Sequence, residues 1–332
     1  MLEYKMRFVM VLAVVLLLSA LPVVGAETWR LEQGQEWKAV SAEGKDKYLL
    51  AVAEIKKLVV TGKAEQAREA FDKLKKDFPE IAGPDLDAFI KAEMLFCKGK
   101  FTKAVRAYDK FLKEYPESGL YEAALDREFS IATSFLAGRR ITVLGIFKMK
   151  GYATGVKIME RISDRAGDAP IAKKAAVAVA KNYEDRRQFD AAYYKWSEIS
   201  DRWPTGPLGR DALLSMARCK HAAYRGPKYD ASNLASAKSY YENFKLRYPE
   251  DDAIIVVDER LKQINEQLAY KRLNIARYYH KTGQEQSANL YYQMVLDNWP
   301  GSSAAEMARE MIDKEFEPTL ERSEGTKKQD DK

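Results

Sequence analysis

The sequence predicts an all-α protein, a right-handed α-solenoid of about six stacked pairs of antiparallel helices. Three observations lead to this fold class. Aromatic-proline pairs recur along the chain, a fixed set of small and bulky residues precedes each proline, and a glycine often precedes the small residue by a constant distance. The composition of 46% hydrophobic and 31% charged residues fits a folded chain with a core, and 18 Gly and 11 Pro in 332 residues leave long stretches free to form helix.

The aromatic-proline pairs mark the ends of the second helices. In each case Ala lies 12 residues before the proline, an aromatic residue 8 before and an apolar residue 5 before, as in Ala288, Tyr292 and Val295 before Pro300. Spacings of four and three residues place these side chains on one face of an α-helix, and proline cannot continue the helix. The five pairs are Phe78-Pro79, Tyr115-Pro116, Trp203-Pro204, Tyr248-Pro249 and Trp299-Pro300.

The first helix of each pair lies upstream of a tight turn. Gly62, Gly99 and Gly283 stand five residues before the repeating Ala of their units, where two antiparallel helices must be joined. Apolar residues recur with helical periodicity before these turns. The predicted first helices cover Leu49–Val60, Leu86–Cys97, Ile171–Tyr183, Leu208–Tyr224 and Ala253–His280.

A sixth, degenerate unit accounts for the long interval between Pro116 and Pro204. Tyr152 begins a stretch in which Gly155 takes the place of Ala and Gly167 takes the place of proline. Three segments exceed the repeat length: the basic and apolar stretch Gly138–Gly151, the turn-rich loop Arg225–Asn233, and an uninterrupted helix from about Ala253 to Lys281.

The two ends of the chain have a different character. Residues 1–26 combine Lys5 and Arg7, an apolar run from Phe8 to Leu18, and small residues before a signal peptidase site, so a secretory signal cleaved after Ala26 is expected. An uncleaved anchor is the alternative. The predicted domains are therefore 1–26 signal peptide, 27–316 repeat domain and 317–332 disordered tail, the last because it is polar throughout.

Composition excludes several function classes. The formal charge of +6 is small for 55 basic and 49 acidic residues, and no long basic stripe favours nucleic acid. No phosphate-binding, nucleophile-elbow or zinc-protease motif occurs, so no cofactor, metal, small-molecule substrate or catalytic residue is expected. With 2 His and 2 Cys, Cys97 and Cys219 are interpreted as buried thiols, and a disulfide between units so far apart is the less favoured alternative.

The repeat resembles the tetratricopeptide repeat, whose unit has small, aromatic and proline positions at these offsets. Within that class the chain resembles the BamD family, also called ComL or YfiO. The resemblance is carried by Ala107–Ser118 (AYDKFLKEYPES), Tyr240–Glu250 (YYENFKLRYPE), the helix Glu259–Ala269 and Ile275–Gly283 (IARYYHKTG).

This resemblance implies a non-enzymatic periplasmic scaffold that acts in outer-membrane β-barrel assembly. It also implies peripheral contact of that scaffold with the outer membrane. The family's lipidated cysteine has no counterpart near Ala26, which leaves open a general periplasmic adaptor that organises cell-envelope or division proteins.

Two candidate interaction sites follow. A solenoid of helix pairs offers the faces of its first helices to an extended peptide or a partner's helix. The repeat register places these candidate protein-binding residues there: Lys56, Phe89, Glu93, Phe96, Lys181, Glu184, Tyr270, Arg277 and His280.

The second candidate is a docking segment within Arg139–Lys150, where cations flank apolar residues, as in an element that lies on an anionic membrane or on a partner. A helix extension that packs on the solenoid is the alternative. Its candidate residues are Arg139, Arg140, Leu144, Ile146 and Phe147.

Overall fold

The computed structural model describes residues 29–30, 38–39, 42–143 and 147–313. The expected signal peptide with its cleavage site after Ala26, the expected tail 317–332, and Leu144 and Ile146 of the docking segment lie outside the described residues. The chain divides into two compact units, Met1–Ala124 and Leu125–Lys332. The single repeat domain at 27–316 stays a prediction.

The first unit contains two helix pairs. They are α2 (Ala42–Val60) with α3 (Ala64–Asp77), and α4 (Pro84–Cys97) with α5 (Phe101–Glu114). A short 3₁₀ helix, η1 (Pro79–Ile81), lies between the pairs, and the two-residue strands β1 (Trp29–Arg30) and β2 (Lys38–Ala39) pair antiparallel. The helix α6 (Tyr121–Leu136) spans the boundary between the units.

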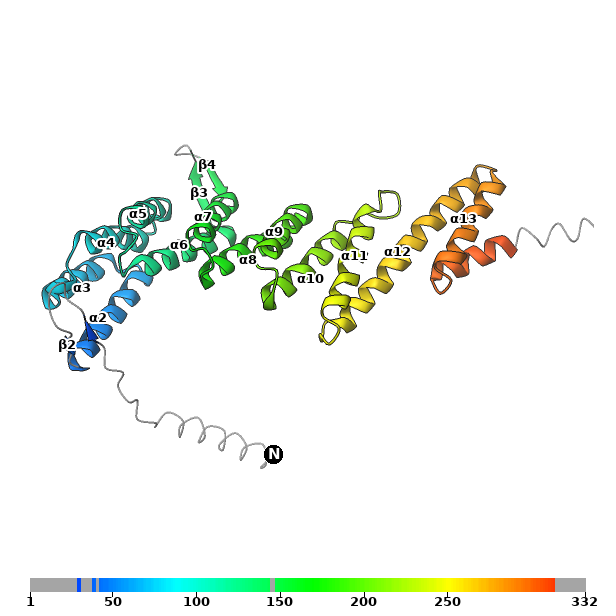
Figure 1. Cartoon of the computed structure of the whole chain (residues 1–332). Coiled ribbons are helices and arrows are strands. Elements are labelled where there is room, and N and C mark those ends of the chain that lie inside the picture. The colour runs from blue at the N-terminus through cyan, green and yellow to red at the C-terminus, as the bar shows by residue number, and fades with distance from the viewer. Residues whose placement is uncertain (1–28, 31–37, 40–41, 144–146, 314–332) are drawn as a thin grey trace, which may run out of the picture. The chain divides into compact units, whose positions relative to one another are not determined.

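The second unit continues the same pattern (Figure 1). α6 is followed by the strands β3 (Arg140–Val143) and β4 (Phe147–Lys150) and then by its partner α7 (Tyr152–Arg165). A further helix over 303–313 follows the last proline and was not identified as an element in the sequence. The other helices are α8 (Pro170–Asp185), α9 (Phe189–Arg202), α10 (Gly206–Ala222), α11 (Ser232–Arg247), α12 (Ile254–Lys281) and α13 (Glu285–Asn298).

The helix pairs confirm the predicted fold class and the predicted role of the aromatic-proline pairs. The aromatic residue before each proline is the residue that ends the helix, and its backbone N–H donates to the carbonyl four residues earlier, as Trp299 does to Val295. The Ala, aromatic and apolar positions are buried in each second helix, for example Ala237, Tyr241 and Phe244 in α11. The degenerate unit keeps this pattern with Gly155, Met159 and Ile162 buried in α7.

The tight turns inside the pairs also form as expected. Gly62, Gly99 and Gly283 adopt φ values of 76°, 66° and 72°, the left-handed conformation that glycine accepts without steric cost. In the α8–α9 turn the same position is occupied by Arg187, with φ 56°, the one non-glycine residue with a positive φ in the part of the chain that the structure describes. Since a side chain in this region costs free energy, the α8–α9 turn is strained.

The segment Gly138–Gly151 forms a β-hairpin, not the helix extension that the sequence analysis kept as an alternative. β3 and β4 pair antiparallel, with Arg140 opposite Lys150 and Ile141 opposite Met149. The hairpin is inserted directly after the left-handed turn at Gly138, which has φ 92°. The Gly151 N–H donates to the Arg139 carbonyl at 2.9 Å and closes the insertion, so α7 starts where an ordinary second helix would.

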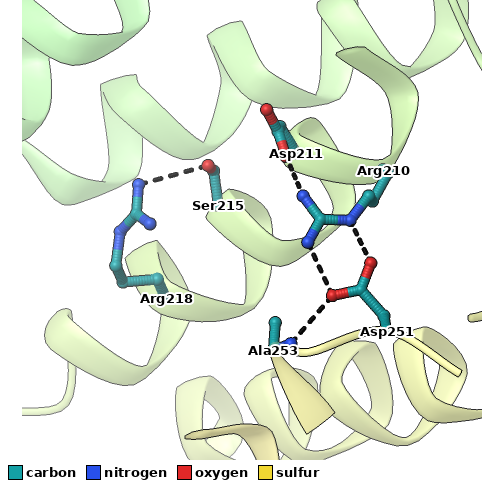
Figure 2. A network of polar contacts seen from close by, with 6 residues as sticks. All are labelled: Arg210, Asp211, Ser215, Arg218, Asp251 and Ala253. Carbon is teal, nitrogen blue, oxygen red and sulfur yellow. Dashed lines mark hydrogen bonds and ion pairs between the residues drawn. The ribbon is translucent and has the colours of Figure 1, made fainter. Parts of the chain in front are cut away.

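One ion-pair network fixes α12 to the pair before it. Figure 2 shows the Arg210 guanidinium of α10 between the carboxylates of Asp211 and Asp251. Arg210 donates to both oxygens of Asp251, and Asp251 also accepts the Ala253 N–H at 2.8 Å, just before α12 begins. These bonds lower the pKa of Asp251 to about 2, the Arg210 contact being the larger cause. The start of α12 is thereby held to the start of α10.

Candidate functional site

The predicted binding residues of the first unit divide between surface and core. Lys56 is exposed on α2. Phe89 is buried, with its ring 6.0 Å from Tyr108 and 5.7 Å from Phe111, and Glu93 is buried beneath the hydroxyl of Tyr108, which donates to it at 2.5 Å. Phe96 is half-buried against Phe101.

Phe89 and Glu93 are therefore core residues of the α4–α5 pair and do not line a binding surface. The physical reason is the Tyr108 hydroxyl. The aromatic position of the second helix is fully buried, and its polar end needs a hydrogen-bond acceptor inside the core, which Glu93 supplies.

The predicted residues of α8 lie on a charged patch. Lys181 is exposed, whereas Glu184 is half-buried and accepts hydrogen bonds from the Trp196 indole of α9 and from the Arg218 guanidinium of α10. Arg218 also donates to Ser215 at 3.1 Å, as Figure 2 shows. Glu184 thus joins three helices of the second unit, and its main effect is to fix their packing.

The predicted residues of α12 separate into two groups. His280 lies at the end of α12, where its Nδ1 is 2.9 Å from Glu285 at the start of α13. Arg277 is half-buried and contacts the sulfur of Met307, in the helix 303–313, at 3.2 Å. Tyr270 is 41% exposed and lines a pocket, so it is the residue of this set that combines exposure with a concave surface.

That pocket lies between α12, the helix 303–313 and the loop after α10. It is a shallow cavity of about 280 Å³, formed by one glutamate, one glutamine and otherwise uncharged side chains. The sequence analysis named only Tyr270 among its residues. The lining residues are Tyr224, Pro227, Glu266, Gln267, Tyr270, Ser303, Ala304 and Met307.

The polar groups around the pocket are mostly bonded within the chain. Gln267 is 3.0 Å from the His221 ring nitrogen, and Glu266 accepts the backbone N–H of Ser303 at 3.2 Å. The Lys271 ammonium donates to the carbonyls of Pro227, at 3.2 Å, and Tyr229, at 2.5 Å. These bonds hold the Arg225–Asn233 loop and the helix 303–313 against α12, so the pocket walls are positioned before a ligand arrives.

One lining group is left unsatisfied. The hydroxyl oxygen of Tyr224 is buried and has no hydrogen-bond partner in the part of the chain that the structure describes. Burial raises the pKa of this phenol, so it remains a neutral donor and acceptor at physiological pH. Because this oxygen is covered by protein atoms, it can bond a peptide carbonyl or amide of a bound chain only after the Tyr224 ring turns toward the pocket.

The described residues give no sign of a metal centre or of a membrane-spanning helix. Over 42–143 and 147–313, no cluster of three or more His, Cys, Asp or Glu side chains has metal-binding geometry. Among the helices in these same ranges, none combines the length and apolar composition that crossing a bilayer requires.

The docking segment has its described residues on the hairpin. Arg139 precedes β3, Arg140 begins it, and both are exposed. Phe147 begins β4. Within this segment Met149 is 57% exposed, an exposed apolar residue that the sequence analysis did not include.

Comparisons with known proteins agree with the repeat architecture. The family model YfiO, described as an outer membrane lipoprotein, matches residues 148–329, and a tetratricopeptide repeat model matches 47–80 and 88–118. No curated protein matches the chain significantly.

Several solved structures are similar at low identity. One is the C-terminal part of a TPR repeat-containing protein from Cytophaga hutchinsonii, with 15% identity, 80% of this chain and 95% of that chain covered, and a TM-score of 0.36. Another is PilW, a widely conserved type IV pilus biogenesis factor, with 17% identity, 81% and 99% covered, and a TM-score of 0.28. A tetratricopeptide repeat protein from Parabacteroides merdae has 12% identity, 81% and 98% covered, and a TM-score of 0.32.

These structural similarities are too distant to inform function, whereas the family match is direct. The YfiO model covers more than half of the 332 residues, including the helix pairs that form the Tyr270 pocket. The chain belongs to the YfiO family of outer membrane lipoproteins and carries tetratricopeptide repeats ahead of the YfiO region.

Proposed function

We propose that this chain is a non-enzymatic scaffold of the cell envelope that acts in outer-membrane β-barrel protein assembly from the periplasmic side. The observation that carries the proposal is the YfiO match over the helix pairs that form the pocket at Tyr270. Tetratricopeptide repeats imply a protein partner, and the family's description supports a location at the outer membrane.

The pocket at Tyr270 suits a segment of another polypeptide. It is shallow and open to the surface. Apart from Glu266 and Gln267, which are bonded within the chain, it is lined by aromatic, proline, thioether and small side chains, which favours one or two apolar side chains of an extended or helical segment. Once the Tyr224 ring turns toward the pocket, its unpaired hydroxyl supplies a hydrogen bond to the backbone of that segment. The exposed part of Tyr270 adds aromatic contact area, which commonly dominates binding energy at interfaces.

A site-specific crosslinking experiment tests the proposal. A photo-reactive amino acid replaces Tyr270, and a matched variant carries it at Leu290, an exposed apolar residue on α13 outside the pocket lining. Crosslinking in intact cells is expected to join the Tyr270 variant to a component of the β-barrel insertion machinery or to a barrel precursor. If both positions give the same adducts, or neither gives an envelope protein, the proposal is wrong.

The Tyr224→Phe variant tests the hydrogen bond. Removing an unpaired buried hydroxyl leaves the free protein as stable as before or slightly more stable, because no bond within the chain is lost. Affinity for the captured partner is expected to fall by about 1 kcal/mol, roughly fivefold. Calorimetry with the purified partner measures this loss. An unchanged affinity would show that the hydroxyl does not bond the partner.

A second candidate function is a general periplasmic adaptor for cell-envelope or division proteins. The observation that favours it is that both cysteines of the sequence, Cys97 in α4 and Cys219 in α10, are buried, so neither is placed to carry a lipid as in the family's lipoproteins. Adducts of the Tyr270 variant with division or cell-wall proteins alone would favour this candidate.

A further inference from the structure

The β3–β4 hairpin presents several cations on one face. Arg140 and Lys150 are directly opposite each other across the two strands, and Lys148 lies two residues before Lys150, so the three side chains share a face. Arg140, Lys148 and Lys150 are all exposed. Like charges directly opposite each other across two strands destabilise a hairpin. The stability of the fold therefore does not explain why Arg140 and Lys150 are paired.

A single tyrosine joins this face to the α8–α9 turn. The Lys150 ammonium is 5.6 Å from the centre of the Tyr152 ring, and the Arg186 guanidinium is 4.3 Å from the same centre. Both cations are attracted to the negative face of the ring. Tyr152 therefore brings together two positive charges from elements that are far apart in the sequence.

The neighbouring residue adds a fifth charge at a conformational cost. Arg187 occupies the left-handed turn position that is glycine in three other helix pairs, and it is exposed. A strained residue that carries an exposed charge next to other charges indicates a function for the charge.

In the described part of the chain, these cations have no carboxylate partners of their own. Within the described residues, none of Arg140, Lys148, Lys150, Arg186 and Arg187 forms an ion pair. The carboxylates nearest in the sequence are Asp185, which is exposed, and Glu184, which is engaged by Trp196 and Arg218. Asp190 is exposed as well, so the turn keeps some negative charge, but the five cations outnumber these carboxylates.

We propose that this cluster, the cationic patch of Arg140, Lys148, Lys150, Arg186 and Arg187, binds an anionic phospholipid surface. The charges are exposed and spread over two elements, which suits many headgroups on a plane. Met149, which is 57% exposed, lies on the opposite hairpin face and points away from a surface that the cations contact, so the proposal rests on the charges alone. Because Cys97 and Cys219 are buried, the patch supplies a membrane contact that lipidation of either residue would not.

Vesicle co-sedimentation of the full chain tests the proposal. One set of vesicles is phosphatidylcholine alone, and in the other a third of the lipid is phosphatidylglycerol. The apolar run Phe8–Leu18 contributes to both sets, whereas Lys5 and Arg7 beside it favour the anionic set, so the ratio of the two affinities is measured for the wild type and for the variants below. A ratio well above one that falls steeply with added salt is expected, and a ratio near one overturns the proposal.

A charge-removal variant locates the effect. Arg140→Gln, Lys148→Gln and Arg187→Ala together remove three charges and leave both cations on Tyr152 in place. Since a basic residue near an anionic surface contributes about fivefold in affinity, the ratio is expected to fall by about 100-fold. The control variant Lys228→Gln, Lys262→Gln and Lys281→Gln removes three exposed charges from other parts of the same compact unit and is expected to keep the ratio.

Two further outcomes would overturn the proposal. An equal loss in both triple variants would show a response to net charge alone. Displacement from anionic vesicles by inorganic phosphate, but not by sodium chloride of the same ionic strength, would show a discrete phosphate site in place of a membrane surface. Circular dichroism of both variants confirms that a loss of binding is not a loss of fold.

Discussion

The Arg187→Gly substitution is expected to stabilise the second compact unit. Arg187 has φ 56° in the α8–α9 turn, and the residues at the same position in three other helix pairs are glycines with φ between 66° and 76°. A non-glycine residue in the left-handed region costs about 1–2 kcal/mol. Glycine removes this cost but gains about 0.5–1 kcal/mol of extra freedom in the unfolded chain. The net stabilisation is therefore about 0.5–1 kcal/mol.

Urea unfolding followed by tryptophan fluorescence measures this change. Trp196 and Trp203 are buried in and directly after α9, the helix that follows the turn, so their emission reports on this part of the chain. The midpoint is expected to rise with an unchanged slope, and the melting temperature is expected to rise by about 1–4 °C for a unit of this size.

The Arg187→Ala variant separates backbone strain from charge. Alanine removes the same positive charge but remains strained at φ 56°, so its stability is expected to stay close to that of the wild type. If Arg187→Ala stabilises as much as Arg187→Gly, the gain comes from reduced repulsion with neighbouring cations such as Arg186, and the explanation from backbone strain is refuted.

Three further perturbations have defined outcomes. Gly155→Ala is expected to destabilise the α6–α7 pair by about 1–3 kcal/mol in thermal unfolding, because an added Cβ would lie 2.9 Å from Leu136 and 3.0 Å from the Ala132 carbonyl; a neutral result would contradict that close approach. Burial raises the pKa of Cys219 to about 12, so a thiol reagent at pH 8 is expected to leave it unmodified until the protein unfolds, and rapid native labelling would contradict its burial. Burial also lowers the pKa of His221, so as the pH falls the imidazole is protonated in the unfolded chain before it is protonated in the folded one. The free energy of unfolding is therefore expected to fall as the pH drops below about 6.5, and to fall less in His221→Gln. Urea midpoints at a series of pH values measure this difference.

The helix pairs were predictable because their pattern is local. A small residue, an aromatic residue and an apolar residue at helical spacing define a buried face without knowledge of what covers it, and proline ends the helix whatever its surroundings. Even Gly155, which departs from the repeat, was placed correctly, because the spacing to Met159 and Ile162 is kept.

The hairpin was missed although its sequence contained a signal. Arg140–Val143 and Phe147–Lys150 alternate polar and apolar residues, the period-two pattern of a strand, between Gly138 and Gly151. Each run is only four residues long. Because both runs lie between segments with helical periodicity, the alternation was not interpreted as a pair of strands.

The binding surface was predictable only in part, because the repeat register cannot show which side chains bond each other. Glu93 has a first-helix position that the sequence places on the surface, yet the Tyr108 hydroxyl draws it into the core. The pocket at Tyr270 needs Met307 from the helix 303–313 and Tyr224 from the loop side, and only the three-dimensional arrangement brings these residues together.

Two of the three additions to the repeat, the β3–β4 hairpin and the loop between α10 and α11, lengthen the turn inside a helix pair, and the third lengthens α12 itself. The connection between α9 and α10 offers no such room, because a Cβ on Gly209 would lie 2.5 Å from the backbone of Pro204. The turns inside pairs have therefore accepted whole extra elements while the helix pairs kept their packing, whereas the α9–α10 connection has no space even for a methyl group on Gly209. Protein engineers who wish to graft a new recognition element onto this scaffold should choose the intra-pair turns and leave the junction at Pro204 intact.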